Sequence, residues 1–323
     1  LGITDIWVSI VYPKTEAEKF EYALSDNDRV GYYEDDKLAE LIQQYKGEIP
    51  LELYKVDLKM PLDLQTVLDQ FGPEVVEDEV PEVPKVAESK LGEVYTLGRH
   101  RLMCGDATDM GAVTILMNKM LADEVITDPP YNTGMQEKTG AAVSTRLSHM
   151  FNDKLTPDQF KDLIEKSFAN MVEATKGSAA FYVFIDWRNV GFIKDSLQDL
   201  MKVNNVIVWD KKVHGLGSDY KFTYEMCVVG KKGDPKIENR IGTDYQDIWR
   251  VQRTMGRNED HATAKPIELL KKPILHASKQ DDIVLDLFGG SGSTLIACEQ
   301  TNRTCYMMEI DPLYCDVIKK RYE

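Results

Sequence analysis

Residues 286–297 read DLFGGSGSTLIA, and this stretch decides the fold. A short apolar run leads into a glycine-rich loop, and the loop leads into residues with helical spacing. Glycines let the backbone turn tightly and approach a ligand closely, while the first turn of the next helix offers unpaired N–H groups. Nucleotide-binding α/β folds usually begin with such a stretch, but here it lies within forty residues of the end of a 323-residue chain.

Strand and helix patterns alternate on both sides of this stretch. The expected strands span residues 123–128, 178–185, 204–210, 225–230, 282–288 and 304–310. The expected helices span residues 156–174, 266–278 and 312–322. Alternation of this kind is typical of a parallel sheet covered by helices. We therefore predict an α/β fold of the Rossmann-like, doubly wound type with a mostly parallel sheet.

A carboxylate follows the glycine loop at the end of the next predicted strand. Glu309 lies nineteen residues after Gly290 and can accept hydrogen bonds from both hydroxyls of a ribose. Leu295 takes the place of the third glycine of the dinucleotide-binding pattern. A nicotinamide-dependent oxidoreductase is therefore one alternative, although it matches the loop imperfectly.

A second motif, DPPYNTG at residues 128–134, comes directly after a predicted strand. Its two prolines hold the turn extended and keep its carbonyls out of a helix. Asp128 and the carbonyl of Pro129 can then each accept one N–H of a planar exocyclic amine, and Tyr131 can stack on the ring that carries the amine. A surface turn with an incidental tyrosine is the alternative for the tetrapeptide alone, whereas the oxidoreductase leaves the motif unexplained.

The two motifs together resemble the amino-group DNA methyltransferases that use S-adenosyl-L-methionine, and in particular their β arrangement. In that group the DPPY motif precedes the glycine motif because the common fold is circularly permuted. The resemblance accounts for the late position of the glycine loop, since the chain would enter the same sheet at another strand. It implies methyl transfer to the N6 amine of an adenine that is flipped out of double-stranded DNA.

Further segments match the motifs of this family in order. GDATD at 105–109 resembles its acidic motif, and HATAKP at 261–266 resembles its HPTQKP motif, from whose commonest form Ala262 and Ala264 depart. The final residues, EIDPLYCDVIKKRYE, match its ribose motif and closing helix. The resemblance implies the catalytic residues Asp128, Pro129, Pro130 and Tyr131. It implies that the cofactor is bound by Asp106, Ala107, Asp128, Lys265, Asp286, Phe288, Gly290, Ser291, Gly292, Ser293, Thr294 and Glu309.

Two segments resemble the strand, basic turn and returning strand around the target-base pocket of the family. They are IVWDKK at 207–212 and DYKFTYEMCVVGKKG at 219–233, in which Tyr224 stands where many relatives have His. Relatives that act on the N4 amine of cytosine usually carry Ser in place of Asp128. Adenine is therefore the expected base and cytosine N4 the alternative, while a non-catalytic DNA-binding protein is an alternative of another class.

The net charge of −15 is unevenly distributed along the chain. Residues 1–90 carry −12, whereas residues 201–280 carry +5. The second half of the chain can therefore receive a polyanion, although a solvated basic face explains the same charges. The DNA-binding residues that we expect are Lys211, Lys212, His214, Arg250, Arg253 and Arg257.

The segment PEVVEDEVPEVPKVAESK marks the clearest domain boundary. We predict an acidic, proline-rich linker over residues 73–92 and a small mixed unit over residues 1–72. A methyltransferase domain is expected over residues 93–323, with a short target-recognition region at about 234–260. The small unit resembles the end of a ParB-like domain. A plain interaction module, binding a second copy of the chain or another partner, is the alternative.

The composition indicates a soluble, cytoplasmic protein. With 43% hydrophobic residues, the chain can bury one large core with a smaller appendage. Its longest apolar stretches fall short of the roughly 18 residues that span a bilayer, and no charged-then-apolar leader opens it. The five scattered cysteines contain no CxxC pair, which predicts free thiols and neither a disulfide framework nor a zinc site.

Overall fold

The computed structural model describes residues 80–132, 155–213, 219–235, 246–253 and 264–323. The chain divides into two units, Leu1–Glu74 and Val75–Glu323, and every described residue belongs to the second. The predicted N-terminal unit at 1–72 therefore lies outside the described residues, as do His214 and Arg257.

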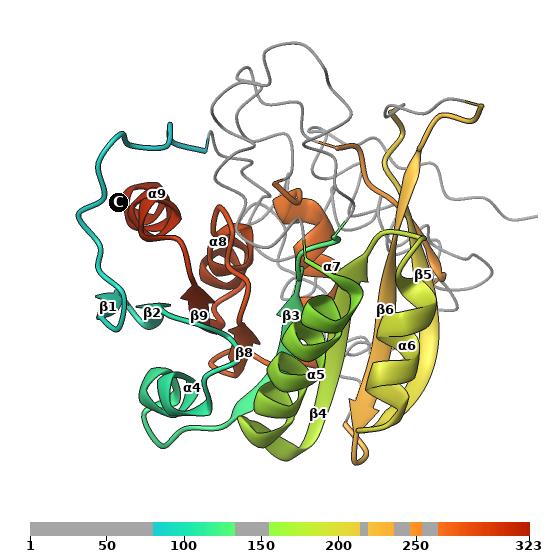
Figure 1. The fold of residues 1–323 in the computed structure, drawn as a ribbon, viewed down its shortest axis with the longest axis horizontal. Coiled ribbons are helices and arrows are strands. Elements are labelled where there is room, and N and C mark those ends of the chain that lie inside the picture. The colour runs from blue at the N-terminus through green and yellow to red at the C-terminus, as the bar shows by residue number, and fades with distance from the viewer. Residues whose placement is uncertain (1–79, 133–154, 214–218, 236–245, 254–263) are drawn as a thin grey trace, which may run out of the picture. The chain divides into compact units, whose positions relative to one another are not determined.

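Within the described residues, a nine-stranded sheet forms the centre of the second unit (Figure 1). In chain order its strands are β1 Val94–Leu97, β2 His100–Cys104, β3 Ala122–Thr127, β4 Thr175–Ile185, β5 Lys202–Asp210, β6 Tyr224–Lys232, β7 Ile248–Arg250, β8 Ile283–Asp286 and β9 Thr304–Glu309. In space their order is β1-β2-β9-β8-β3-β4-β6-β5-β7. Five of the eight neighbouring pairs in this described sheet run parallel, which confirms the predicted mostly parallel sheet.

All six strands predicted from the sequence are present. They correspond to β3, β4, β5, β6, β8 and β9, and their ends differ from the predicted ends by at most three residues. Strands β1, β2 and β7 were not predicted from the sequence. These strands are four, five and three residues long, and they lie at or next to the two edges of the sheet.

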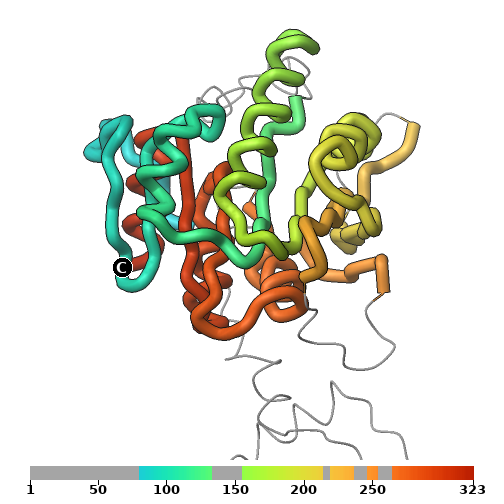
Figure 2. Tube along the Cα trace, turned by 90° about the horizontal axis from the view of Figure 1, so that it is seen from below, coloured from blue at the N-terminus to red at the C-terminus, as the bar shows by residue number. Residues whose placement is uncertain are grey.

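Helices cover both faces of the sheet, as a doubly wound fold requires (Figure 2). One face carries α4 Met110–Met117, α5 Pro157–Glu173 and α6 Val190–Gln198, and the other carries α7 Ile267–Ala277, α8 Ser293–Gln300 and α9 Pro312–Tyr322. The predicted start of α5 is confirmed. The Thr156 hydroxyl accepts from the Gln159 N–H, and the Gln159 side chain accepts from the Thr156 N–H, which forms a capping box.

The apolar core consequently has two halves, one on each face of the sheet. Phe168 of α5 is buried in the first half, and Leu295 of α8 is buried in the second. Successive residues of a strand point to opposite faces. In β3, Val125 therefore belongs to the first half and Ile126 to the second, and each is at most 1% exposed. A strand buried on both faces reads as a continuous apolar run, which is why the central strands were predictable.

The glycine loop and the DPPY turn both lie at the carboxyl ends of the central strands of the sheet. β3 and β8 lie side by side and run parallel, so their carboxyl ends meet there. The hydroxyl of Thr127, the last residue of β3, donates to Asp286, the last residue of β8, at 3.0 Å. The two residues are 159 positions apart in the chain. In open α/β sheets, ligands bind outside the carboxyl ends of the strands.

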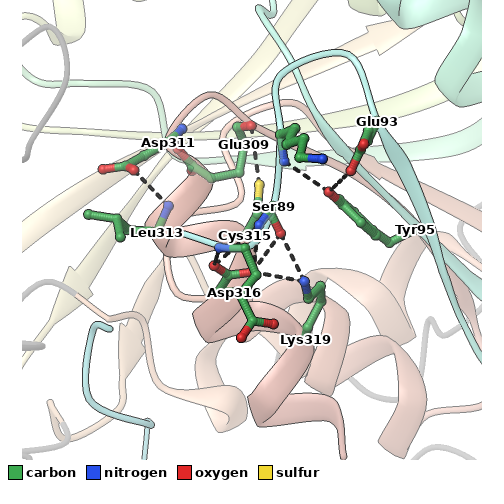
Figure 3. A network of polar contacts seen from close by, with 11 residues as sticks. Ser89, Glu93, Tyr95, Glu309, Asp311, Leu313, Cys315, Asp316 and Lys319 are labelled. Carbon is green, nitrogen blue, oxygen red and sulfur yellow. Dashed lines mark hydrogen bonds and ion pairs between the residues drawn. The ribbon is translucent and has the colours of Figure 1, made fainter. Parts of the chain in front are cut away.

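The end of the predicted linker is anchored on α9 (Figure 3). The backbone N–H of Glu88 donates to the Asp316 carboxylate at 2.6 Å, and the hydroxyl of Ser89 donates to it at the same distance. Lys319 donates to the Ser89 hydroxyl at 3.0 Å, and its ammonium lies 4.7 Å from the centre of the Tyr95 ring. Because Ser89 is only 4% exposed, the last residues of the predicted linker pack as part of the second unit.

Candidate active site

The DPPY turn that follows β3 is held in place by two asparagines. The side-chain amide of Asn132 exchanges hydrogen bonds of 2.9 and 3.0 Å with the backbone of Leu155. The amide of Asn189, the N-cap residue of α6, donates to the Tyr131 carbonyl at 2.7 Å. These contacts fix the turn against the starts of α5 and α6. Neither asparagine was predicted to have this role, because the partner of each is a backbone group distant in the chain.

Five ionisable side chains meet at this turn, and we call them the charge cluster: Asp128, Tyr131, Lys211, Glu225 and Lys265. Lys265 Nζ lies 2.5 Å from Asp128 Oδ2 and 3.3 Å from Glu225 Oε2. The Tyr131 hydroxyl lies 2.8 Å from Asp128 Oδ1 and 3.0 Å from Glu225 Oε2. The same hydroxyl accepts from Lys265 Nζ at 3.0 Å. Lys211 Nζ lies 3.2 Å from Glu225 Oε1 and completes the cluster.

The cluster is assembled from distant parts of the chain. Asp128 follows β3, Glu225 is the second residue of β6, and Lys265 precedes α7. Lys265 was expected to bind the cofactor, and the structure places its ammonium on the expected catalytic carboxylate. Glu225 was not among the site residues predicted from the sequence. The available signal was an acidic residue near the start of the otherwise apolar run EMCVV.

Burial and neighbouring charges shift the pKa values of the cluster in different directions. Burial raises the pKa of Asp128 above its usual value, although Lys265 opposes this shift. Burial alone would also raise the pKa of Glu225, but Lys265 and Lys211 lower it to about 2. Burial would lower the pKa of Lys265, but Asp128 and Glu225 raise it. Lys265 therefore keeps its charge at neutral pH, and Glu225 is fully ionised.

The glycine loop leads from β8 into α8 and lies beside the predicted ribose acceptor. Gly290 and Gly292 have φ angles of 52° and 85°, which favour glycine. A Cβ at Gly290 would meet no atom within 4 Å, so there is open space at this position. The Gly290 N–H donates to Glu309 Oε2 at 2.7 Å, and the Asp311 N–H donates to Oε1 at 2.9 Å. Burial raises the pKa of Glu309 to about 7.

Asp286, which was expected to bind the cofactor, is enclosed by its own loop. Its side chain is 2% exposed. It accepts from the hydroxyls of Thr127 and Thr294 and from the Phe288 N–H, at 2.7 to 3.1 Å. Burial raises its pKa to about 7. Asp286 and Thr294 therefore brace the loop from inside, whereas Phe288 is half-buried at its rim.

The serines of the loop are tied to α9. Arg321 donates to the Ser291 carbonyl and to the Ser293 hydroxyl, each at 3.0 Å. Ser293 is buried at the start of α8. These contacts fix the path of the loop between Gly290 and the helix.

The GDATD motif lies next to Glu309. The Gly105 N–H donates to the Glu309 carbonyl at 2.9 Å. Asp106 is exposed, and its carboxylate accepts from the Thr108 N–H at 2.8 Å, whereas Ala107 is buried. The carboxylate of Glu309 is thus held by the open glycine loop on one side, and its backbone pairs with the GDATD motif on the other. These groups fit a nucleoside such as the adenosine part of S-adenosylmethionine, because they offer a carboxylate acceptor for hydroxyls beside open glycine backbone.

The described basic residues that were expected to bind DNA lie at or just after the ends of β5 and β7. β7 comes from the predicted target-recognition region and runs parallel to β5, with Arg250 opposite Asp210. The Arg253 N–H donates to the Lys211 carbonyl at 3.1 Å. Lys212 and Arg250 are exposed, but Lys211 is only 6% exposed and belongs to the charge cluster. Lys211 is therefore buried and paired with Glu225, and its expected contact with DNA stays a prediction.

Other features of the described residues concern membranes, thiols and metals. No helix in the described part of the chain is long and apolar enough to cross a membrane. The five cysteines are free thiols, and all are buried. Among the residues that the structure describes, no group of three or more His, Cys, Asp or Glu side chains could hold a metal ion.

Solved structures of DNA methyltransferases share this fold. The M1.HpyAVI-SAM complex superposes with a TM-score of 0.51 at 20% identity, over 69% of this chain and 98% of that one. The PvuII DNA methyltransferase, described as cytosine-N4-specific, superposes with a TM-score of 0.54 at 16% identity, over 74% of this chain and 90% of that one. The fold of the second unit is therefore the Rossmann-like fold of these two structures.

Sequence similarity shows to which family this chain belongs. Residues 122–320 match the N6/N4 methyltransferase family model, described as DNA methylase, and the chain belongs to this family. The type II methyltransferase M.HpaI of Haemophilus parainfluenzae is 26% identical over 247 residues, 69% of this chain and 74% of its own. M2.DpnII of Streptococcus pneumoniae is 26% identical over 226 residues, 62% of this chain and 82% of its own. S-adenosyl-L-methionine, the predicted cofactor, is the methyl donor of this family.

Proposed function

We propose that this protein methylates the N6 amine of adenine in double-stranded DNA. The position of Asp128 carries the proposal. Its carboxylate follows β3, beside the glycine loop of the parallel strand β8, in a turn whose two prolines have no N–H to donate. Such a site suits a planar exocyclic amine. Relatives that act on cytosine N4 usually have Ser at this position, whereas this chain has Asp.

The chemistry requires the target amine to become a nucleophile. Its lone pair is conjugated into the ring, and it becomes available as the nitrogen turns tetrahedral. Asp128 and the Pro129 carbonyl each accept one N–H, through hydrogen bonds that strengthen as charge develops on the nitrogen. S-adenosylmethionine supplies the electrophilic methyl group. Glu309 and the glycine loop hold the nucleoside in place, which aligns the reacting atoms. The amine gives up one proton, and Asp128 is the carboxylate placed to receive it.

The target base must leave the duplex before it can reach Asp128. Flipping costs a few kcal/mol, which stacking and edge contacts offset. Tyr131 provides the stacking surface, since its hydroxyl is fixed by the charge cluster and its carbonyl by Asn189. Stacking of a base on an aromatic side chain contributes roughly 1 to 3 kcal/mol. Lys212, Arg250 and Arg253 contact the phosphates around the flipped base.

Methyl transfer to DNA tests the proposal directly. Purified protein is incubated with labelled S-adenosylmethionine and plasmid DNA from a host that lacks adenine methylation, and the product is sequenced with detection of modified bases. We expect N6-methyladenine at one short sequence. Modification of cytosine N4 alone would overturn the choice of base, and no transfer to any DNA would overturn the proposed function.

A further inference from the structure

Glu225 contacts three members of the charge cluster, yet none of the functions described above uses it. Its side chain is 19% exposed and lies beside the ammonium groups of Lys265 and Lys211, whose side chains are each 8% exposed. It also lies 3.0 Å from the hydroxyl of Tyr131. Two ammonium groups and one hydroxyl thus converge on a carboxylate that lies at the start of β6, beside the expected catalytic turn.

Asp128 already has donors on both of its oxygens. Lys265 lies on Oδ2 and the Tyr131 hydroxyl on Oδ1, although the target amine also needs an acceptor there. A hydroxyl has one proton, and this hydroxyl has two carboxylates within hydrogen-bond distance. When the proton points to Glu225, Oδ1 of Asp128 keeps its lone pairs for the amine.

The charges of the cluster support the same role for Glu225, which is to keep Asp128 a good hydrogen-bond acceptor. Lys265 lies between Asp128 and Glu225, so its positive charge is divided between two carboxylates. Without Glu225, the full charge would act on Asp128 and would make that carboxylate a weaker hydrogen-bond acceptor. Screening by salt is weak here because the ammonium is buried. Lys211 lies on the other side of Glu225 and limits its negative charge.

We propose that Glu225 is a positioning residue for methyl transfer: it takes the hydroxyl proton of Tyr131 and shares the charge of Lys265, and so keeps Asp128 able to accept the target amine. The inference rests on the proposed function. Glu225 acts through Asp128 and does not itself hold the base.

Two variants that remove opposite charges test this role. Glu225→Gln should lower kcat about tenfold or more while the KM for S-adenosylmethionine changes less than about threefold. It should move the acid limb of the pH–rate profile to lower pH, because Asp128 loses a negative neighbour. Lys211→Met removes a positive charge instead, so it should move the acid limb to higher pH. A role in packing alone would not shift the profile in opposite directions.

The titration of Asp128 can also be read without turnover. Carbon-13 NMR of labelled aspartate side chains, assigned with Asp128→Asn, should show its midpoint lowered in Glu225→Gln and raised in Lys211→Met. Four other groups interact electrostatically with Asp128: Tyr131 and Lys265 in the cluster, Cys227 of β6 and Asp286 of β8. None of them is changed in either variant. Lys194→Met removes an exposed charge from α6 and is the matched control, with no shift expected.

The outcomes separate the two proposals. If DNA is methylated but the midpoint of Asp128 moves in neither variant, or moves in the same direction in both, the role of Glu225 is overturned and the proposed function stands. If the midpoints move as expected but the wild-type protein methylates no DNA, the proposed function is overturned, and the role in transfer falls with it. Should Glu225→Gln not fold, Glu225→Asp retracts the carboxylate and should give a smaller shift in the same direction.

Discussion

Asp128 serves both the proposed chemistry and the stability of the protein, because its carboxylate is also the nearest partner of a buried lysine. Asp128→Ala should lower methyl transfer by at least about a hundredfold, since it removes one of the two acceptors for the amine. It should also lower the free energy of unfolding by about 2 kcal/mol, because Lys265 loses this carboxylate and keeps Glu225 and the Tyr131 hydroxyl as partners. Single-turnover kinetics and urea denaturation measure the two effects. Calorimetry should show S-adenosylmethionine affinity within about threefold of wild type, and substantial remaining activity would contradict the assignment.

We expect Glu309, the predicted ribose acceptor, to make cofactor affinity depend on pH. Only the ionised carboxylate can accept from both ribose hydroxyls without offering a proton of its own, and burial places the pKa of Glu309 at about 7. The affinity for S-adenosylmethionine, measured by calorimetry, should therefore rise between about pH 6 and pH 8. Glu309→Gln should weaken binding and remove this dependence. Asp286, whose pKa is also about 7, provides the matched control, because Asp286→Asn should keep the dependence.

The same carboxyl groups have the opposite effect on the stability of the free protein. Asp286 has a pKa of about 7 when folded, against an unperturbed value of 3.8. The folded state therefore binds this proton more tightly than the unfolded chain does, and its contribution to stability falls as pH rises from about 4 to about 7. In urea denaturation, Asp286→Asn should show a smaller loss of stability than wild type over this range. An equal loss in both proteins would mean that other groups cause it.

Among the secondary-structure elements, those buried on both faces could be predicted and those at the edges could not. Residues Ile283–Asp286 form an apolar run bounded by turn residues, a pattern with few other interpretations. β7 has only three residues and forms by pairing with β5. The neighbouring residue Val251 accepts from the Trp209 indole at 2.8 Å, and this contact spans 42 residues. Local sequence carries little information about such long-range pairing.

In the candidate site, too, some residues could be predicted from the sequence and others could not. Asp128, Gly290 and Glu309 could be predicted because each belongs to a short motif whose chemistry is complete within a few residues. The pairing of Glu225 with Lys265 could not be predicted, since it depends on how β6 is placed relative to β3 and α7 in three dimensions. The burial of Lys211 depends on the same arrangement.

β7 brings basic residues of the predicted target-recognition region to the end of β5, and this gives a prediction about DNA. If Arg250 contacts a phosphate, Arg250→Ala should lower the slope of log affinity against log salt by about one unit. The loss should be similar on DNA of any sequence, because phosphate contacts carry no base code. Fluorescence anisotropy across a salt series measures the slope. Lys194→Ala on α6 is the control, and an unchanged slope in Arg250→Ala would exclude a phosphate contact by this residue.

At the scale of the whole molecule, acidic and basic charges are separated along the chain. Residues 1–79 carry −12, and residues 211–257, which include part of the charge cluster and β7, carry +4. A strongly acidic segment repels the DNA backbone. We therefore expect the front of the chain to lie away from DNA or to serve another partner. The hydrogen bond from Ser89 to Asp316 anchors the end of the predicted linker to α9 of the second unit.

Two truncations test whether methyl transfer and DNA binding are independent of the acidic front of the chain. Deleting residues 1–79 keeps the anchor, so methyl transfer should persist and DNA affinity should be equal or higher, because a charge of −12 is removed. Deleting residues 1–90 also removes Glu88 and Ser89, which takes three donors from the partly buried carboxylate of Asp316. The longer deletion should therefore be less stable than the shorter one by about 1 to 3 kcal/mol in urea denaturation. If the shorter deletion is folded and binds S-adenosylmethionine but no longer binds DNA, the acidic segment takes part in DNA recognition. The expectation that this segment lies away from DNA would then be wrong.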